Sequence, residues 1–358
     1  MALRKIRIAG AGPSGLSAAI NLAKAGFEVE VFEAARDCGH RFGGDLQALE
    51  NWSRRENVLE DLKGMNIDVN FDCDPFSKIT LATEKELSDV RFNEDLFYLV
   101  KRGAVKGSLD QGLKEQAVDS GVKINFNSSV PRDGADIIAT GPVSREVMGI
   151  DRGVVFETGM DDIAVGLLDN DAAYKGYSYL LVTNGYGCMC TVLLDKFENV
   201  NKCFQTTETI FKKHFDFNIR NPKPVGGVGS FSVKGDFKLN GKFFAGEAAG
   251  VQDFLWGFGI RNAIASGHLA ARSFIENTDY QAVAKSYFEN RLKASAVNRF
   301  LWEILLGSKF LNNWAINKIG KVKTEKILDM LYKTHNSYSK LIFPVAIRHL
   351  GKRYKTLR

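Results

Sequence analysis

Three glycines near the N-terminus have the spacing that a phosphate-binding turn requires. Gly10, Gly12 and Gly15 follow the apolar run 5–9 and precede the helical pattern 16–26. In a strand–turn–helix unit, the first glycine permits the tight turn and the second lets the backbone approach a pyrophosphate. The third lets the helix pack closely on the strand. Because the helix N-terminus presents free N–H groups and a positive dipole end, this turn predicts a dinucleotide site. The predicted turn residues are Gly10, Ala11, Gly12, Pro13, Ser14 and Gly15.

An acid follows the second apolar strand of the same unit. The run 28–32 ends at Glu33, with Ala34 behind it. A carboxylate here accepts hydrogen bonds from an adenosine ribose, and it favours a free 2′-hydroxyl, so FAD or NAD rather than NADP. A βαβ unit without a ligand is the alternative, and the number of conditions met in register argues against it.

A second glycine-rich segment far along the chain distinguishes between the two dinucleotides. Gly246 and Glu247 follow the apolar strand 242–245, and an acid at that place can hydrogen-bond a flavin ribitol. The small-residue helix that comes next can point its N-terminus at the isoalloxazine, where its dipole stabilises the negative charge of a reduced flavin. A nicotinamide enzyme needs no such second cradle, so we expect FAD. The residues leading into this helix are Gly257, Phe258, Gly259 and Ile260.

Three segments together resemble the geranylgeranyl reductase family, which lies within the para-hydroxybenzoate-hydroxylase-like flavoprotein superfamily. They are residues 10–26, 100–121 and 246–271. The resemblance implies an FAD-dependent oxidoreductase that reduces carbon–carbon double bonds of an isoprenoid or other apolar substrate. It implies a reduced electron donor, which is NAD(P)H or a ferredoxin.

The resemblance also assigns cofactor-binding roles to positions outside the two glycine motifs. They are Arg41, Gly44 and Asp45 beside the flavin ring, Arg102 at the start of the middle segment, Val130 near the adenine, and Gly141 where the chain returns to the FAD. The chain departs from the family where Gly43 replaces a frequent cysteine, Glu247 an aspartate and Phe254 a proline.

Two other functions stay open beside the reductase. One is a flavin monooxygenase or halogenase on the same fold, although the Trp-x-Trp-x-Ile-Pro segment usual in such halogenases is missing. The other is a non-catalytic flavin-binding module.

The sequence identifies neither catalytic residues nor a metal site. The five histidines lack ligand spacing, and Cys188 and Cys190, on one strand face, have no Cys-x-x-Cys partner, so we interpret them as packing residues. Phe254 and Trp256 belong to an apolar loop that we interpret as a substrate pocket, with ordinary core packing as the alternative.

The surrounding elements predict an α/β protein: a Rossmann-like FAD-binding domain, an inserted antiparallel-sheet substrate domain and a helical C-terminal segment. We assign residues 1–48, 95–150 and 225–280 to the first, 49–94 and 151–224 to the second, and 281–358 to the third. Within them we expect helices over 46–67, 108–120 and 201–215, with Ser108 as an N-cap. Four apolar runs in 152–194 predict an antiparallel meander.

Positive charge is concentrated in the tail. From Arg291 onward there are fifteen Lys and Arg residues against three acids, although the whole chain carries a net charge of only +6. The tail is expected to form several helices, either as a peripheral contact with an anionic membrane or as an amphipathic cap on the main domain. The basic residues form no nucleic-acid reading motif, so no such partner is expected. Scattered cysteines and no apolar leader predict a cytoplasmic protein, with peripheral membrane contact left open.

Overall fold

A six-stranded, mostly parallel sheet forms the centre of the dinucleotide-binding region, which includes the N-terminal glycine turn. The computed structural model describes residues 5–142, 146–231, 235–306, 328, 331–332 and 337–354. The strand order is β15-β16-β9-β1-β2-β8, and only β15 runs antiparallel to its neighbour. The strands are β1 (Lys5–Ala9), β2 (Glu28–Phe32), β8 (Lys123–Asn125), β9 (Ile137–Ile138), β15 (Lys238–Leu239) and β16 (Lys242–Phe244). This sheet confirms the predicted dinucleotide-binding architecture.

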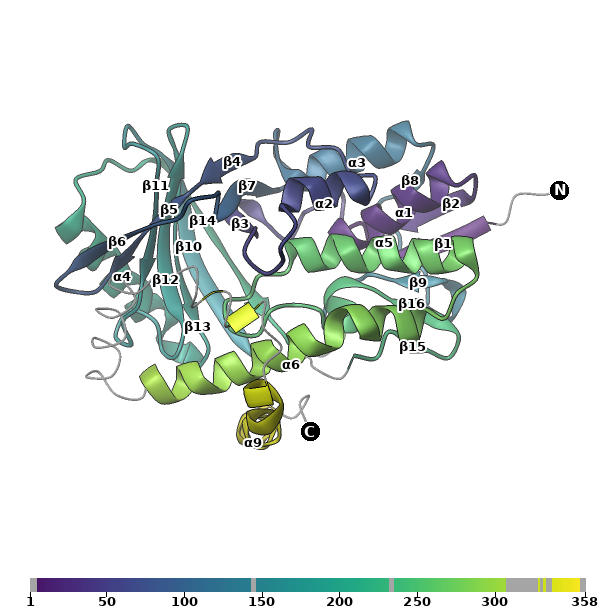
Figure 1. Ribbon diagram of the computed structural model, residues 1–358. Coiled ribbons are helices and arrows are strands. Elements are labelled where there is room, and N and C mark those ends of the chain that lie inside the picture. The colour runs from purple at the N-terminus through teal and green to yellow at the C-terminus, as the bar shows by residue number, and fades with distance from the viewer. Residues whose placement is uncertain are drawn as a thin grey trace.

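Helices α1 (Pro13–Lys24), α3 (Leu109–Asp119) and α5 (Ile260–Glu276) accompany this sheet (Figure 1). The contact between α1 and α5 depends on small residues, because a Cβ on Gly267 would lie 2.0 Å from the carbonyl oxygen of Ser14. Helix α3 begins where predicted, and the Ser108 hydroxyl accepts a hydrogen bond from the Gln111 N–H. The close packing of α5 on α1 therefore holds the start of α5 next to the turn that precedes α1.

A three-stranded antiparallel sheet follows in place of the predicted helix over 46–67. Strand β3 (Gly43–Glu50) pairs with β7 (Phe97–Gly103), which pairs with β4 (Asp74–Phe76). Helix α2 occupies only Val58–Gly64, and its N-cap Asn57 accepts a hydrogen bond from the Leu59 N–H at 2.8 Å. The helix prediction was wrong for 46–57. Over 46–50, pairing with β7 outweighs the helical propensity of Leu, Gln, Ala and Glu, and residues 51–57 form an irregular connection.

The second large sheet has seven strands in the order β14-β10-β13-β12-β11-β5-β6. They are β5 (Lys78–Ala82), β6 (Leu87–Arg91), β10 (Gly149–Glu157), β11 (Ile163–Leu167), β12 (Tyr177–Thr183), β13 (Tyr186–Leu193) and β14 (Arg220–Gly229). The four predicted strands and the covering helix α4 (Val200–His214) are present. The simple meander is wrong, because β10 pairs with β13 and β14 rather than with β11.

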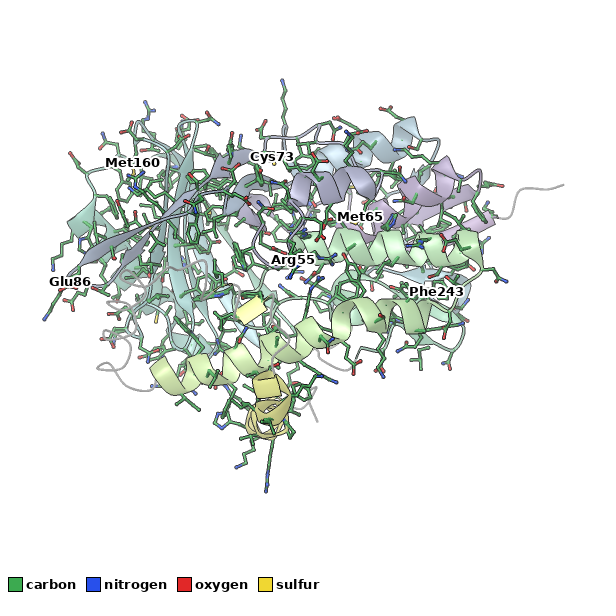
Figure 2. All side chains as sticks on the ribbon, in the orientation of Figure 1. Arg55, Met65, Cys73, Glu86, Met160 and Phe243 are labelled. Carbon is green, nitrogen blue, oxygen red and sulfur yellow. The ribbon has the colours of Figure 1, made fainter. Side chains whose placement is uncertain are left out.

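Figure 2 shows the two sheet regions side by side, with Phe243 of β16 in the first and Met160 and Glu86 beside strands of the second. Three short 3-10 helices complete the connections: η1 (Arg132–Gly134), η2 (Phe197–Asn199) and η3 (Gly246–Ala249).

Helices α6 (Tyr280–Leu306) and α9 (Ser337–Arg353), from the described part of the C-terminal segment, lie along the lower side of the molecule in Figure 1. The buried face of α9 contributes Leu350 to a core cluster with Ala296 of α6 and Phe254. Glu303 of α6 accepts hydrogen bonds from Arg299 and from Arg353, which also reaches Asp195. The described part of the tail therefore packs as a cap on the main domain. Much of the tail over which several helices were expected lies outside the described residues.

No helix among the described residues is long and apolar enough to cross a membrane.

Candidate functional site

The N-terminal turn separates glycines that the fold needs from one that it does not. Gly10 has φ +101°, and a Cβ there would lie 2.3 Å from the carbonyl oxygen of Ala139. A Cβ on Gly15 would lie 2.0 Å from the oxygen of Gly10. Gly12 differs, because no atom lies within 4 Å of its Cβ position and its backbone is extended. The space in front of the α1 N-terminus is therefore open, as a bound pyrophosphate requires.

Glu33 closes the turn from the end of β2. Its two carboxylate oxygens accept hydrogen bonds from the N–H groups of Ala11 at 2.8 Å and Ala35 at 2.9 Å. Each oxygen keeps a further lone pair that can receive a ribose hydroxyl. Ala34 lies in the bend between Glu33 and Ala35.

The second glycine segment lies against the first, as the FAD interpretation requires. A Cβ on Gly246 would come within 2.4 Å of the Ser14 hydroxyl, and one on Gly141 would lie 3.8 Å from Glu247 Oε2. The Gly246 N–H also donates to the Ser266 hydroxyl of α5 at 2.7 Å. Three segments far apart in the sequence thus meet beside the N-terminus of α1.

Glu247 uses the extra length of its side chain in an ion pair. Arg41 Nη1 lies 2.8 Å from Glu247 Oε2, and Arg41 Nη2 donates to the Val228 carbonyl at 2.6 Å. Both side chains of the pair are partly exposed, so solvent screens it and its contribution to stability is small. Its effect is to place the segment that carries Gly44 and Asp45 next to η3.

Arg102 is buried and committed to neighbouring protein groups. Its guanidinium donates to both carboxylate oxygens of Asp110 at 2.9 and 3.0 Å, and to Gln47 Oε1 at 3.0 Å. It also lies over the Phe42 ring, 4.3 Å from its centroid. Arg102 therefore joins β7, α3 and β3 next to Gly44 and Asp45. Direct contact with the flavin stays a prediction for this residue.

Val130 packs, half-buried, on the core of the dinucleotide-binding part. Its predicted contact with adenine likewise stays a prediction.

The loop that leads into α5 is held by Asp253. The Asp253 N–H donates to the Phe258 carbonyl at 2.8 Å, and its carboxylate accepts the Trp256 N–H at 2.7 Å. Gly259 is the N-cap of α5 and supplies no side-chain cap, so the first N–H groups of the helix stay available. They begin at Ile260, as the sequence predicts for the flavin end of the site.

Phe254 and Trp256 occupy different environments within this loop. Phe254 is 3% exposed and lies against Phe231, with the two ring centroids 4.9 Å apart, which is core packing. Trp256 packs edge-on against Tyr177 and Trp302, at centroid distances of 5.3 and 4.8 Å. The substrate-pocket role stays a prediction for both.

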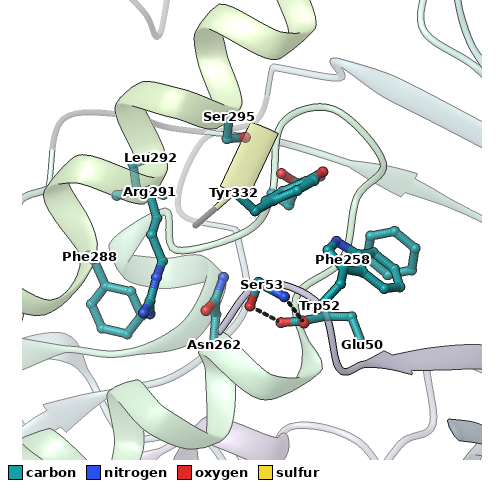
Figure 3. Close-up of a pocket in the computed structure, with 11 residues that line it drawn as sticks. Glu50, Trp52, Ser53, Phe258, Asn262, Phe288, Arg291, Leu292, Ser295 and Tyr332 are labelled. Carbon is teal, nitrogen blue, oxygen red and sulfur yellow. Dashed lines mark hydrogen bonds between the residues drawn. The ribbon is translucent and has the colours of Figure 1, made fainter. Parts of the chain in front are cut away.

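A cavity of about 30 Å³ lies behind the same loop, which is room for one or two water molecules. Figure 3 shows the residues that line it. Three buried atoms of lining residues have no hydrogen-bond partner among the described residues: Asp253 Oδ1, Asn262 Oδ1 and Arg291 Nη1. Burial raises the pKa of Asp253 to about 6. The sequence did not predict this cluster. The usable signal was Asp253, an acid directly before the apolar run Phe254–Phe258. The remaining lining residues are Glu50, Trp52, Ser53, Phe258, Phe288, Leu292, Ser295 and Tyr332.

The inner face of the seven-stranded sheet contacts both segments expected beside the flavin ring. The Tyr186 hydroxyl donates to the Gly44 carbonyl at 2.8 Å, and the Tyr177 hydroxyl donates to the Trp256 carbonyl. Asp151 lies on this face and was also missed. It stands one residue before the first apolar run predicted in 152–194, whereas β10 begins at Gly149.

All five cysteines are free, in agreement with the packing role expected for Cys188 and Cys190. Over the described ranges, no group of three or more His, Cys, Asp or Glu side chains could hold a metal ion.

Comparison with known proteins agrees with this geometry. The NAD(P)-binding Rossmann-like domain family matches residues 8–45. No curated protein matches the sequence significantly. Among solved structures, a geranylgeranyl bacteriochlorophyll reductase-like protein from Thermoplasma acidophilum is 16% identical, with a TM-score of 0.65 over 99% of this chain and 100% of that one.

Two other similar structures are flavin enzymes that act on different substrates. A triple mutant of the flavin-dependent brominase Bmp2 is 12% identical, with a TM-score of 0.67 over 97% of this chain and 99% of that one. The p-nitrophenol 4-monooxygenase PnpA from Pseudomonas putida is 15% identical, with a TM-score of 0.63 over 94% and 100%. The chain therefore has the fold of flavin-dependent oxidoreductases and monooxygenases. At these identities the similarity concerns the fold alone.

Proposed function

We propose that the chain binds FAD and reduces carbon–carbon double bonds of an isoprenoid or another apolar substrate. The observation that carries the FAD proposal is the meeting of the N-terminal turn, Glu33, Gly246–Glu247 and the α5 N-terminus. The open space above Gly12 supports it, because the fold itself gives no reason for glycine at that position.

Each part of the cofactor has a matching group in the chain. The turn N–H groups would bind the pyrophosphate, Glu33 the adenosine ribose and Glu247 the ribitol. The N-terminus of α5 would face the pyrimidine end of the isoalloxazine, where its dipole favours the anionic reduced form. When bound, the reduced flavin supplies the hydride. NAD(P)H or a ferredoxin is the proposed electron donor.

The choice of reduction rests on the family resemblance. Oxygenation or halogenation is the second candidate, because monooxygenases and a brominase share the fold to a similar degree.

An apolar substrate fits a further proposal, that the cytoplasmic protein contacts anionic membrane through α9. Leu341 and Val345 of this helix are 77% and 58% exposed, and Lys340, Arg348 and Lys352 are exposed beside them. Apolar side chains flanked by basic ones are typical of helices that lie in the interface of an anionic bilayer.

The first experiment is anaerobic rapid mixing of the photoreduced protein with three partners. We expect purified protein to be yellow and to release FAD on denaturation. Geranylgeranyl diphosphate serves as the prenyl probe, oxygen as the test of oxygenation, and buffer as the blank. Flavin reoxidation by the prenyl probe in the absence of oxygen supports reduction.

Other results in the same experiment point elsewhere. A long-lived peroxyflavin spectrum with oxygen and no reaction with the prenyl probe would favour a monooxygenase or halogenase. Reoxidation by neither favours a non-catalytic flavin module. Colourless protein that takes up no added FAD contradicts the whole proposal.

A further inference from the structure

Asp151 occupies the middle of one row across the seven-stranded sheet. The register places it opposite Gly227 of β14 on one side and Val192 of β13 on the other. Val192 in turn lies opposite Tyr177 of β12. Since residues directly opposite one another point to the same face of a sheet, Asp151 and Tyr177 share the inner face, two strand spacings or roughly 10 Å apart.

Both ends of this row are attached to segments expected beside the flavin ring. Val228, next to Gly227, accepts the hydrogen bond from Arg41, which leads into Gly44 and Asp45. At the other end, Tyr177 donates to the Trp256 carbonyl, next to Gly257. Asp151 therefore lies between the two segments that would flank the flavin ring, one with Gly44 and Asp45 and the other with Gly257.

On the β14 side, only main chain and no side chain lies against the Asp151 carboxyl. Gly227 has no side chain, and a Cβ there would stand 3.3 Å from Asp151 Oδ1. The Cys190 thiol lies 3.9 Å from Asp151 Oδ2, and the Gly227 N–H also donates to the carboxyl. Asp151 is half-buried rather than sealed in the core.

The other titratable groups around this position are poorer proton donors. Tyr177 uses its hydroxyl on Trp256, and burial raises the pKa of its phenol far above the usual range. The Cys190 thiol donates to the Arg152 carbonyl at 3.2 Å, and burial raises its pKa as well. Burial raises the pKa of Asp45 as well. Asp45 is, however, more deeply buried than Asp151, and its carboxylate accepts the Gly43 N–H at 2.9 Å.

We propose that Asp151 is the proton donor of the flavin site. This inference rests on the proposed reductase function. In the balanced step, the π bond of the substrate breaks as one alkene carbon receives the hydride from the reduced flavin, and the other carbon receives the carboxyl proton of Asp151. Two C–H bonds form, the flavin becomes oxidised, and the Asp151 carboxylate recovers a proton from solvent.

Electrostatics support this role. Burial, followed by the charge of Asp45, raises the pKa of Asp151 to about 6, whereas Arg41 lowers it. The titratable and charged groups that face it are Asp45 of β3, Arg41, Cys190 of β13, and Tyr177 and Tyr179 of β12. A carboxyl that titrates close to working pH suits general acid catalysis.

The kinetic test compares three holoproteins: wild type, Asp151→Asn, and Asp161→Asn as an exposed control outside the site. Each is reduced anaerobically and mixed with geranylgeranyl diphosphate. General acids contribute about 100-fold or more, so Asp151→Asn should slow reoxidation by the probe about 100-fold or more. It should also lose the fall in rate above pH 6 that wild type and Asp161→Asn show. Reaction of Asp151→Asn at the wild-type rate overturns the proposal.

A second measurement is independent of any substrate. In protein labelled with ¹³C at aspartate carboxyls, the Asp151 resonance is assigned as the one missing in Asp151→Asn. Addition of FAD should shift this resonance and its titration, because the carboxyl faces the ring. An unshifted resonance overturns the placement of Asp151 even if the wild type reduces the probe. If the wild type ignores the probe, the reductase function fails, whereas a shift still supports Asp151 as the acid over the flavin.

Thermodynamic linkage provides a third readout, on the apoprotein. Because the pKa of Asp151 is raised from 3.8 to about 6 on folding, the native state holds a proton that the unfolded state releases in this window. The stability of the wild type relative to Asp151→Asn should therefore fall as pH rises from about 4 to 6 and level off above it. Urea unfolding of both proteins across this range measures the difference, and a flat difference contradicts the raised pKa.

Discussion

At the scale of single residues, the glycines of the N-terminal turn divide into two kinds. Gly10 and Gly15 are dictated by the fold, since a Cβ at either would collide with main-chain oxygen. Gly12 meets no such constraint, so its identity points to something outside the chain. The distinction between structural and binding glycines is invisible in the motif and appears only with coordinates.

This division leads to a sharp prediction for Gly12→Val. The substitution should raise the Kd for FAD at least tenfold, because its side chain fills the space a pyrophosphate would occupy. The melting temperature of the apoprotein should stay within about 2 °C of wild type. FAD fluorescence titration and thermal unfolding measure the two quantities.

Gly64→Ala at the end of α2 is the matched control, since its Cβ position is equally open and lies far from the turn in sequence. Unchanged FAD affinity in Gly12→Val would contradict the proposed phosphate site.

The role of a residue could be predicted from the sequence where a local pattern specifies that role. Glu33, Ser108 and the two glycine motifs stand where their spacing placed them, because a turn or a cap is specified by neighbours along the chain. Asp151 and Asp253 escaped prediction for a physical reason. Their importance comes from what surrounds them in space, which is set by strand register and by a loop folding onto itself.

At the scale of elements, β3 illustrates the same limit. The run 46–50 has good helix formers, yet it belongs to strand β3 because β7 offers a partner from about fifty residues downstream. Periodicity along the sequence does not reveal a pairing strand that is distant in the chain. The order of the seven-stranded sheet was missed for the same reason, since β10 closes onto β13 and β14 across long stretches of chain.

The buried ion pair between Arg102 and Asp110, which connects β7 with α3, leads to a prediction about stability. Asp110→Ala should destabilise the protein by about 3–5 kcal/mol, because it leaves the Arg102 guanidinium buried without its charged partner. Asp119→Ala, at the exposed end of the same helix, should change stability by no more than about 0.5 kcal/mol. Urea unfolding of both variants decides the matter, and equal small effects would show that the buried pair contributes little.

At the scale of the whole molecule, charge and exposed apolar surface coincide at one place. The chain without its tail is acidic in balance, and the basic excess begins at Arg291. The described part of that tail packs on the main domain through Ala346 and Leu350, so both alternatives raised by the sequence share one helix. Its buried face forms a cap, and its outer face keeps Leu341 and Val345 in solvent.

Sedimentation with vesicles tests whether that outer face contacts membrane. Wild type should bind vesicles that contain 30% phosphatidylserine, a composition we choose to give a strongly anionic surface, and bind pure phosphatidylcholine vesicles much less. Burying one leucine side chain contributes about 1.5–3 kcal/mol, so Leu341→Glu should weaken binding about tenfold or more. Binding should also weaken as salt rises, because each basic residue near the surface contributes about 1 kcal/mol through a screened attraction.

Leu239→Glu separates this surface from a general effect of added charge. Leu239 is 57% exposed, which is similar to Val345, but it lies on β15 at the edge of the six-stranded sheet. The two substitutions change the net charge of the chain equally, so only their position differs. If both weaken vesicle binding alike, attraction depends on overall charge and α9 is simply a cap. If only Leu341→Glu does so, α9 orients the protein on the bilayer, and an apolar substrate would reach the flavin site from the lipid.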